Sequence, residues 1–153
     1  MLDIGDKAPD FHGFNQNNQE IKLSNFQGKK AVLYFYPKDD TPGCTKQACS
    51  FRDNFSELTE KGIEVIGVST DDIKSHVKFQ KKYDLPFNLV ADPDKEIVNT
   101  YEVYREKNMY GKVSMGTVRT TFLIDENGNI VHIFKKPKSE IHATEVLNKF
   151  DSL

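Results

Sequence analysis

The sequence of 153 residues has no tryptophan and only two cysteines, Cys44 and Cys49. Its first residues, Met-Leu-Asp-Ile-Gly-Asp-Lys, lack the basic segment and the apolar stretch of a signal peptide. Without an export signal, two cysteines indicate a reducing compartment, where a cysteine pair is more often catalytic or metal-binding than structural. We therefore expect a cytoplasmic protein.

Long apolar runs and a strong charge of either sign are also missing. No stretch approaches the roughly 20 apolar residues that a membrane-spanning helix needs. The formal net charge of −2 gives no general attraction to nucleic acids or to anionic membranes. We expect neither class of partner. The length is that of one domain, and we find no repeat or linker, so residues 1–153 are expected to form a single domain.

Strand patterns and helix patterns alternate along the chain. Strands are expected at 11–23 (two, around the polar tract 15–19), 31–36, 63–69, 87–90, 118–124 and 130–134. Helical segments are expected at 24–28, 44–61 (ended by Gly62), 72–83 (capped by Asp71 or Asp72), 92–101 (opened by Asp92-Pro93) and 139–150. Residues 102–117 are expected to form a polar loop with hairpin character. This order predicts an α/β fold with a central mixed sheet flanked by helices, as a thioredoxin-like domain with an N-terminal β-hairpin extension would show.

Cys44 lies where a buried strand gives way to a helix. Pro42 and Gly43 break the chain just before it, and a helical pattern follows. The first N–H groups of a helix have no internal partner and carry a partial positive charge, so a thiolate there is stabilised relative to its thiol. The alternative is a buried cysteine that acts as a small apolar side chain. Because Cys44 follows Thr-Pro-Gly at a helix start, we expect it to be reactive and do not expect it in the core.

The stretch Pro37-x-x-x-Thr41-x-x-Cys44 resembles the active-site signature of the peroxiredoxins, thiol peroxidases that reduce hydroperoxides. The spacing of Cys44 and Cys49 is similar to that in the bacterioferritin comigratory protein branch, also called peroxiredoxin Q. The resemblance covers nearly the whole chain, in the family's order. Further matching segments are 5–11 (Gly-Asp-Lys-Ala-Pro-Asp-Phe), 67–69 (Gly-Val-Ser), 91–94 (Ala-Asp-Pro-Asp) and 119–125 (Arg-Thr-Thr-Phe-Leu-Ile-Asp).

The resemblance implies roles for several residues around Cys44. Arg119 would lie over the thiolate and polarise the O–O bond, although an arginine at a strand end is usually a solvated charge. The Thr41 hydroxyl would hold the peroxide and bond the thiolate, unless it only satisfies its own loop. Pro37 would shield the thiolate from solvent. Gly43, with the preceding proline, would shape the turn so that backbone N–H groups point at the peroxide.

Two carboxylates lie close to Cys44 in the sequence. Asp39 and Asp40 disfavour a nearby thiolate, so we expect a cation to compensate them, and Arg119 is the candidate. Many relatives have Glu where this chain has Gln47. Glutamine cannot pair with Arg119 as an ion, so we expect Gln47 to support it through a hydrogen bond only.

Cys49 is expected to resolve the sulfenic acid formed on Cys44 as an intramolecular disulfide. On a regular helix, two residues five apart lie about 140° apart around the axis, with roughly 9 Å between their Cα atoms. A disulfide needs Cα atoms within about 7 Å, so the helix would have to unwind in each cycle. By resemblance, thioredoxin or a similar dithiol protein then restores both thiols, no cofactor is needed, and the protein is a monomer.

Other features predict less. His12, His76, His132 and His142 show no metal-ligand spacing and are expected to be solvated or capping residues. The enzymatic alternative, a thioredoxin-type oxidoreductase, has a Cys-x-x-Cys spacing that this chain lacks. A redox-gated binding protein for unfolded clients is the non-enzymatic alternative, and no feature of the sequence specifically favours it.

Overall fold

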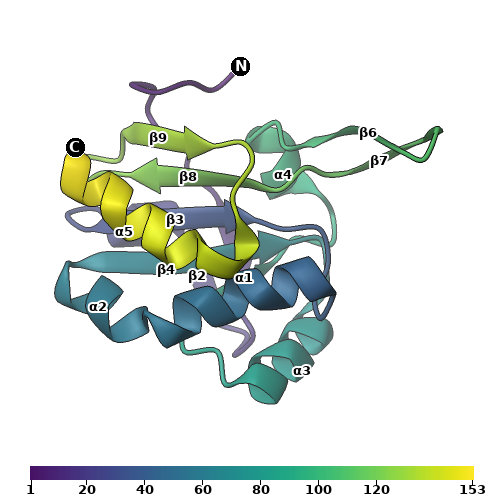
Figure 1. The fold of residues 1–153 in the computed structure, drawn as a ribbon, viewed down its shortest axis with the longest axis horizontal. Coiled ribbons are helices and arrows are strands. Elements are labelled where there is room, and N and C mark those ends of the chain that lie inside the picture. Colours follow the sequence, from purple (N-terminus) through teal and green to yellow (C-terminus); the bar gives the residue numbers. More distant parts are fainter.

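The computed structural model describes residues 1–153, apart from the side chain of Met109. Seven strands form one sheet in the order β2-β1-β5-β4-β3-β8-β9, and β6 pairs with β7 in a second sheet (Figure 1). The strands are β1 His12–Phe14, β2 Glu20–Lys22, β3 Lys30–Phe35, β4 Ile63–Ser69, β5 Asn88–Ala91, β6 Tyr104–Met109, β7 Lys112–Thr117, β8 Thr120–Ile124 and β9 Ile130–Phe134. The helices are η1 Leu23–Phe26, α1 Pro42–Asp53, α2 Phe55–Glu60, α3 Ile73–Tyr83, α4 Glu96–Thr100, η2 Ser139–Ile141 and α5 His142–Ser152.

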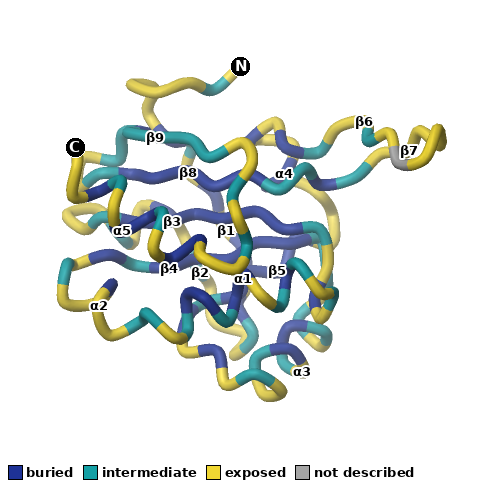
Figure 2. Tube along the Cα trace, viewed as in Figure 1, coloured by how far each residue is buried: buried dark blue, intermediate teal, exposed yellow. Residues whose placement is uncertain are grey.

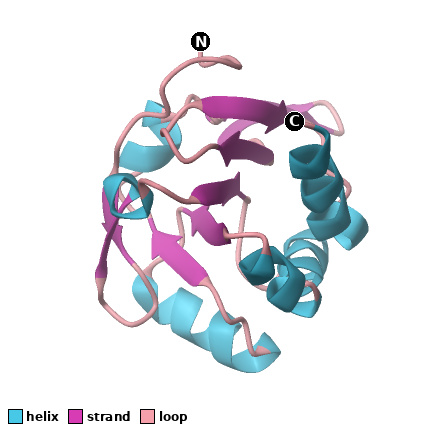
Figure 3. Cartoon of the chain, turned by 90° about the vertical axis from the view of Figure 1, so that its left-hand side faces the viewer, coloured by secondary structure: helices cyan, strands magenta, loops and turns pink.

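The sheet is mixed, as predicted. β3 pairs in parallel with β4, and β4 with β5, whereas β8 is antiparallel to β3 and β9 to β8. The N-terminal hairpin of β1 and β2 joins the sheet through β1 and β5. Helices lie on both sides of the strands (Figure 3). Among the described helices, none is both long and apolar enough to cross a bilayer.

β3 is the strand around which both cores form. Val32 and Tyr34, with Tyr36 just after the strand, belong to a cluster shared with α1, α3 and α5. The alternate residues, Leu33 and Phe35, face a second cluster beneath α4 and the N-terminal segment. Successive side chains of a strand point to opposite faces, so the continuous apolar run of β3 reflects cover on both sides. Figure 2 shows the strands at the centre of the molecule as buried.

The helix predicted over 44–61 starts earlier in the structure and is interrupted in the middle. α1 begins two residues earlier, with Pro42 at its first position, where the missing N–H costs no hydrogen bond. It ends at Asp53, because Asn54 leaves the helical conformation and its side-chain amide donates to the carbonyl oxygen of Ser50 at 2.8 Å. α2 then continues to Glu60, and Gly62 follows with a φ of +71°, as predicted for a residue that ends a helix.

The helix predicted to open at Asp92-Pro93 begins later, at Glu96. Lys95 adopts a left-handed conformation at the N-cap, so the chain makes a turn before the helix starts. The Asp92 carboxylate still accepts hydrogen bonds from the N–H groups of Ile97 and Val98, at 3.1 and 2.9 Å. Asp92 therefore caps the helix from outside it. In α3 the cap is Asp72, whose carboxylate accepts from the N–H of Ser75 at 2.8 Å.

The segment 102–117, predicted as a polar loop with hairpin character, contains a regular hairpin of β6 and β7. β6 and β7 pair residue by residue from Tyr104 with Thr117 to the Tyr110-Gly111 turn, where both residues have positive φ. The hairpin projects from the rest of the molecule (Figure 1). Its polar composition reflects exposure, because little of it packs on the core.

A substitution at Gly67 in β4 would test how tightly the core packs around β3. A Cβ at this position would lie 2.8 Å from Cζ of the buried Tyr34. We expect Gly67→Ala to lower the free energy of unfolding by about 2 kcal/mol, because this ring has no room to move aside. Urea denaturation measures the change.

The control is Tyr34→Phe. The Tyr34 hydroxyl is buried and has no hydrogen-bond partner among the described residues, so its removal should leave stability unchanged or raise it by up to about 1 kcal/mol. A Gly67→Ala protein as stable as the wild type would contradict the close packing described here.

Candidate active site

Cys44 is the third residue of α1, just beyond the loop that follows β3. Its side chain is only 2% exposed and packs with Tyr34, Tyr36 and Ala48 in the core cluster under α1. The expectation that a helix start would keep Cys44 out of the core was wrong. Burial lowers the effective dielectric around the sulfur, so each nearby charge acts on it more strongly.

Arg119 contacts this sulfur directly. Its Nη2 donates to Sγ of Cys44 at 3.2 Å, and its Nη1 donates to Oε1 of Gln47. The sheet register explains this position. Phe35, the last residue of β3, pairs with Thr120, the first residue of β8, so Arg119 lies beside the loop that leads from β3 to α1.

Gly43 and Gln47 make room for the guanidinium and hold it. A Cβ at position 43 would lie 3.2 Å from Nη2 of Arg119, so a side chain there would push the guanidinium from its place. Gln47 is fully buried, and the hydrogen bond predicted for it is present. The charge of Arg119 is thus left unneutralised by its neighbour on α1.

Thr41 and Pro37 lie in the loop before α1, and both are half-buried. The Thr41 hydroxyl donates to the carbonyl oxygen of Lys38 at 2.8 Å and, among the described residues, makes no hydrogen bond with Cys44. The expected bond to the thiolate is therefore not present. Since its proton is donated to Lys38, the hydroxyl oxygen can act towards a peroxide O–H only as an acceptor. The shielding role of Pro37 stays a prediction.

The carboxyl groups of the loop are paired with groups other than Arg119. Asp40 accepts from Nζ of Lys82 at 2.8 Å and from the hydroxyl of Tyr83 at 2.6 Å. These hydrogen bonds, the one from Lys82 first, lower the pKa of Asp40. Asp39 is buried and contacts His76. The expectation that Arg119 balances both carboxylates was wrong, and its charge remains available to the thiol.

Two of the four histidines are buried, contrary to the sequence prediction. His76 and His142 are both fully enclosed, whereas His12 is exposed and His132 half-buried. His142 bonds Glu145 and Thr121 through its two ring nitrogens, at 2.9 and 2.8 Å. Burial lowers the pKa of His142, and Glu145 partly opposes this effect. No sequence pattern marked either histidine, because the burial of each depends on contacts with other elements, such as that of His142 with Thr121 in β8.

Asp39, Asp71 and His76 place potential metal-ligating atoms within 4.8 Å of one another. Those atoms already form hydrogen bonds with one another or with neighbouring groups. The cluster therefore forms a closed hydrogen-bonded network.

Cys49 lies on the same continuous helix as Cys44 and is half-buried, and both thiols are free. Burial raises the pKa of the Cys49 thiol. The helix keeps the two cysteines on different sides of its axis, so the unwinding expected from the sequence applies to α1 as it stands.

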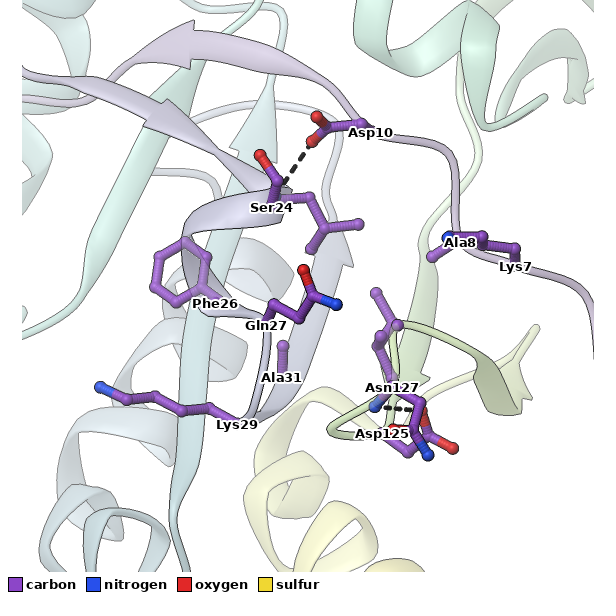
Figure 4. Close-up of a pocket in the computed structure, with 13 residues that line it drawn as sticks. Lys7, Ala8, Asp10, Ser24, Phe26, Gln27, Lys29, Ala31, Asp125 and Asn127 are labelled. Atoms are coloured by element: carbon purple, nitrogen blue, oxygen red, sulfur yellow. Dashed lines mark hydrogen bonds between the residues drawn. The ribbon is translucent and has the colours of Figure 1, made fainter.

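A cavity of about 240 Å³ lies at the other end of the sheet (Figure 4). It is lined by residues at the start of β3 and the end of β8, among them Ala31 and Ile124. The carboxylates of Asp10 and Asp125 at its wall accept hydrogen bonds from the N–H groups of Ser24 and Asn127, both at 3.0 Å. Cys44 follows the opposite end of β3, so this cavity is not part of the thiol site.

The sequence pattern of the AhpC/TSA family matches residues 4–133. The chain belongs to this family of peroxiredoxins. Within it, the chain is 46% identical over 148 residues to the putative peroxiredoxin Bcp of Coxiella burnetii, covering 97% of this chain and 98% of the relative. It is 42% identical over 146 residues to peroxiredoxin Bcp of Bacillus subtilis, covering 95% and 93%.

Solved structures of peroxiredoxin Q share the fold of this peroxiredoxin. A cysteine-to-serine variant from Xylella fastidiosa matches with a TM-score of 0.93 and 34% identity, covering 99% of this chain and 97% of that chain. One from Xanthomonas campestris matches with a TM-score of 0.87 and 37% identity, covering 93% and 90%. The thioredoxin-like fold and the Bcp/peroxiredoxin Q branch, both predicted from the sequence, are confirmed.

Arg119→Met tests the contact with the sulfur. We expect the second-order rate constant for oxidation of Cys44 by hydrogen peroxide to fall by about a hundredfold or more, because a preorganised donor to the reacting centre is lost. The rate constant of Arg119→Lys should lie between those of the wild type and Arg119→Met. Lysine keeps the charge but cannot donate to the sulfur and to Gln47 at the same time. Stopped-flow mixing of the reduced proteins measures these rates.

Arg105→Met is the matched control, because Arg105 is an exposed arginine on β6. Its rate constant should stay within about twofold of the wild type, since an exposed charge is largely screened. An Arg119→Met protein that reacts as fast as the Arg105→Met protein would show that the contact does not assist the reaction.

Proposed function

We propose that this peroxiredoxin reduces hydroperoxides with Cys44 as the nucleophile and Cys49 as the resolving thiol. One observation carries the proposal: the guanidinium of Arg119 lies 3.2 Å from the sulfur of a buried cysteine in the first turn of a helix. A guanidinium and a helix N-terminus both favour the thiolate over the thiol. A relative, the Xanthomonas campestris bacterioferritin comigratory protein, is described by its alkyl peroxide reduction activity, so we include organic hydroperoxides among the substrates.

In the first step the Cys44 thiolate attacks the terminal oxygen of the peroxide. An S–O bond forms and the O–O bond breaks, which leaves Cys44 as sulfenic acid. The leaving hydroxide or alkoxide takes a proton and departs as water or alcohol. Arg119 and the N–H groups of Gly43 and Cys44 stabilise the charge that develops on the oxygens, and the Thr41 hydroxyl accepts the hydrogen bond of the peroxide O–H.

In the second step the sulfur of Cys49 attacks the sulfenic sulfur of Cys44. A disulfide forms and water leaves. This step requires α1 to open, and two contacts must break with it. The Ser50 hydroxyl accepts from the N–H of Ala143 at 3.0 Å, and Lys46 pairs with Glu140 at 3.5 Å. Both hold α1 against the segment that begins α5.

The cycle closes when a dithiol donates two electrons and two protons to the disulfide. We assign this role to thioredoxin or a similar dithiol protein. Its two thiols can reduce the Cys44–Cys49 disulfide by thiol–disulfide exchange and become a disulfide themselves. We propose that residues 1–153 form one domain that acts as a monomer in a reducing, cytoplasmic environment.

Cys49→Ser separates the two steps. We expect this variant to oxidise at Cys44 with an unchanged single-turnover rate and to lose its recycling by thioredoxin, since no disulfide can form. Cys44→Ser should lose both. Consumption of peroxide coupled to thioredoxin oxidation measures recycling, and mass spectrometry detects the sulfenic acid by its trapped adduct. Undiminished recycling in Cys49→Ser would rule out the resolving role.

A further inference from the structure

A buried histidine–carboxylate pair lies behind the loop that carries Thr41. Asp39 belongs to this loop, and His76 belongs to α3. Nδ1 of His76 lies 2.6 Å from Oδ2 of Asp39, and the two side chains are 0% and 4% exposed. The pair is distinct from the groups that contact the sulfur of Cys44.

The second ring nitrogen shows how many protons the pair holds. Nε2 of His76 lies 3.1 Å from the carbonyl oxygen of Val90 in β5. A carbonyl oxygen can only accept, so Nε2 carries a proton. The bond between Nδ1 and Oδ2 then needs one more proton, on His76 or on Asp39. The pair is either imidazolium with carboxylate or neutral imidazole with carboxylic acid, and its net charge is zero in both cases.

Other groups fix Asp39 at its side chain and its backbone. Its carboxyl group accepts from the hydroxyl of Tyr36 at 2.6 Å and from that of Ser75 at 2.8 Å. Its N–H donates to Asp71 at 2.8 Å, and the same oxygen of Asp71 accepts from Ser69 at 2.7 Å. The loop is thus tied to β4 and α3.

The charged and titratable groups around the pair are few. Tyr36, the residue after β3, faces it, and burial followed by the charge of Asp39 raises the pKa of this tyrosine well above its usual range. Tyr36 therefore stays protonated and remains a donor. Asp71, after β4, faces the backbone of Asp39, and Asp72 caps α3 with its carboxylate on the N–H of Ser75.

We propose that His76 and Asp39 are positioning residues for the reaction at Cys44. Asp39 lies two residues before Thr41, and α1 begins at Pro42, so the pair determines where the chain enters the helix that holds the thiol within reach of Arg119. Because the pair is neutral, it anchors the loop without placing a net negative charge beside a thiolate. This inference rests on the proposed function.

Two substitutions distinguish the hydrogen bonds from the shared proton. In Asp39→Asn, the amide can donate to Nδ1 of a neutral His76 while its oxygen accepts from Tyr36, so the loop keeps its anchor. In His76→Leu, Asp39 loses its proton-sharing partner and is left buried beside an apolar side chain. Asp40→Asn is the matched control, because Asp40 is the exposed neighbour and pairs with Lys82.

The measurement is the pH profile of Cys44 oxidation by hydrogen peroxide in a single turnover. His76→Leu should lower the plateau rate by roughly tenfold to a hundredfold, because small displacements of a reacting group have effects of this size. If the pair is imidazolium with carboxylate, its midpoint should also move to higher pH, because the carboxylate left uncompensated opposes a thiolate. Asp39→Asn should lose about threefold at most with little change in midpoint, and Asp40→Asn should match the wild type.

Two results would overturn the inference. One is a folded His76→Leu protein with the wild-type profile. The other is an Asp39→Asn protein that loses as much as His76→Leu. If His76→Leu does not fold, His76→Asn replaces it, since its amide keeps a donor to Asp39 but supplies no second proton. Its plateau rate should still fall, because the asparagine amide cannot bond both Asp39 and the carbonyl oxygen of Val90 as the imidazole ring does. A folded His76→Asn protein with the wild-type profile would overturn the inference.

The rate of Cys44 alkylation by iodoacetamide can be measured over the same pH range, and this measurement needs no peroxide. If the wild-type protein does not reduce peroxide but the alkylation profiles keep the predicted order, the proposed function fails while the positioning of Cys44 by His76 and Asp39 stands.

Discussion

The short contact between the guanidinium of Arg119 and the sulfur of Cys44 is the interaction on which the rest of this site depends. Neither group reaches the other by local structure alone. The pairing of β3 with β8 brings Arg119 beside the loop, and Gly43 leaves space for the guanidinium. Burial of the sulfur then makes the charge effective, because the same separation in water would give a much weaker interaction.

The neighbouring groups do not neutralise the positive charge of Arg119. Asp40 is paired with Lys82, and Asp39 shares a proton with His76, so neither loop carboxylate needs Arg119 as its counter-ion. Gln47 holds the guanidinium through a neutral oxygen. The site therefore offers a cation to the thiolate and to the oxygen atoms of a bound peroxide.

The helix that carries Cys44 also keeps it apart from Cys49. α1 is continuous through both residues, and its N-terminus stabilises the thiolate only while it is folded. A disulfide between them requires the opposite state, in which these turns are open. The activation and the resolution that we propose thus need two conformations of one segment. In the folded conformation, Ser50 contacts Ala143 in α5 and Lys46 contacts Glu140 in η2.

Much of this fold follows from local sequence. The apolar runs of β3 and β4 and the aspartate cap of α3, expected at Asp71 or Asp72, each predict their element, because neighbouring residues determine it. The break at Asn54 was missed, since it depends on whether one side chain bonds the backbone of Ser50.

The parts of the site that were missed depend on contacts between distant segments. The burial of Cys44 arises from the packing of α1 on the sheet, and nothing next to it in the sequence shows this. The partner of Asp39 is His76, a residue 37 positions away on another helix. Arg119 was found only because its Arg-Thr-Thr-Phe string resembles that of a known family.

The most direct test mixes the reduced protein with one equivalent of hydrogen peroxide, followed by a rapid quench and measurement of intact mass and free thiols. The account predicts a monomer that has lost two hydrogens and both thiols, which would be the Cys44–Cys49 disulfide. Two thiols that remain unreacted would show that Arg119 and the helix start do not activate Cys44, and would contradict the thiol-peroxidase mechanism.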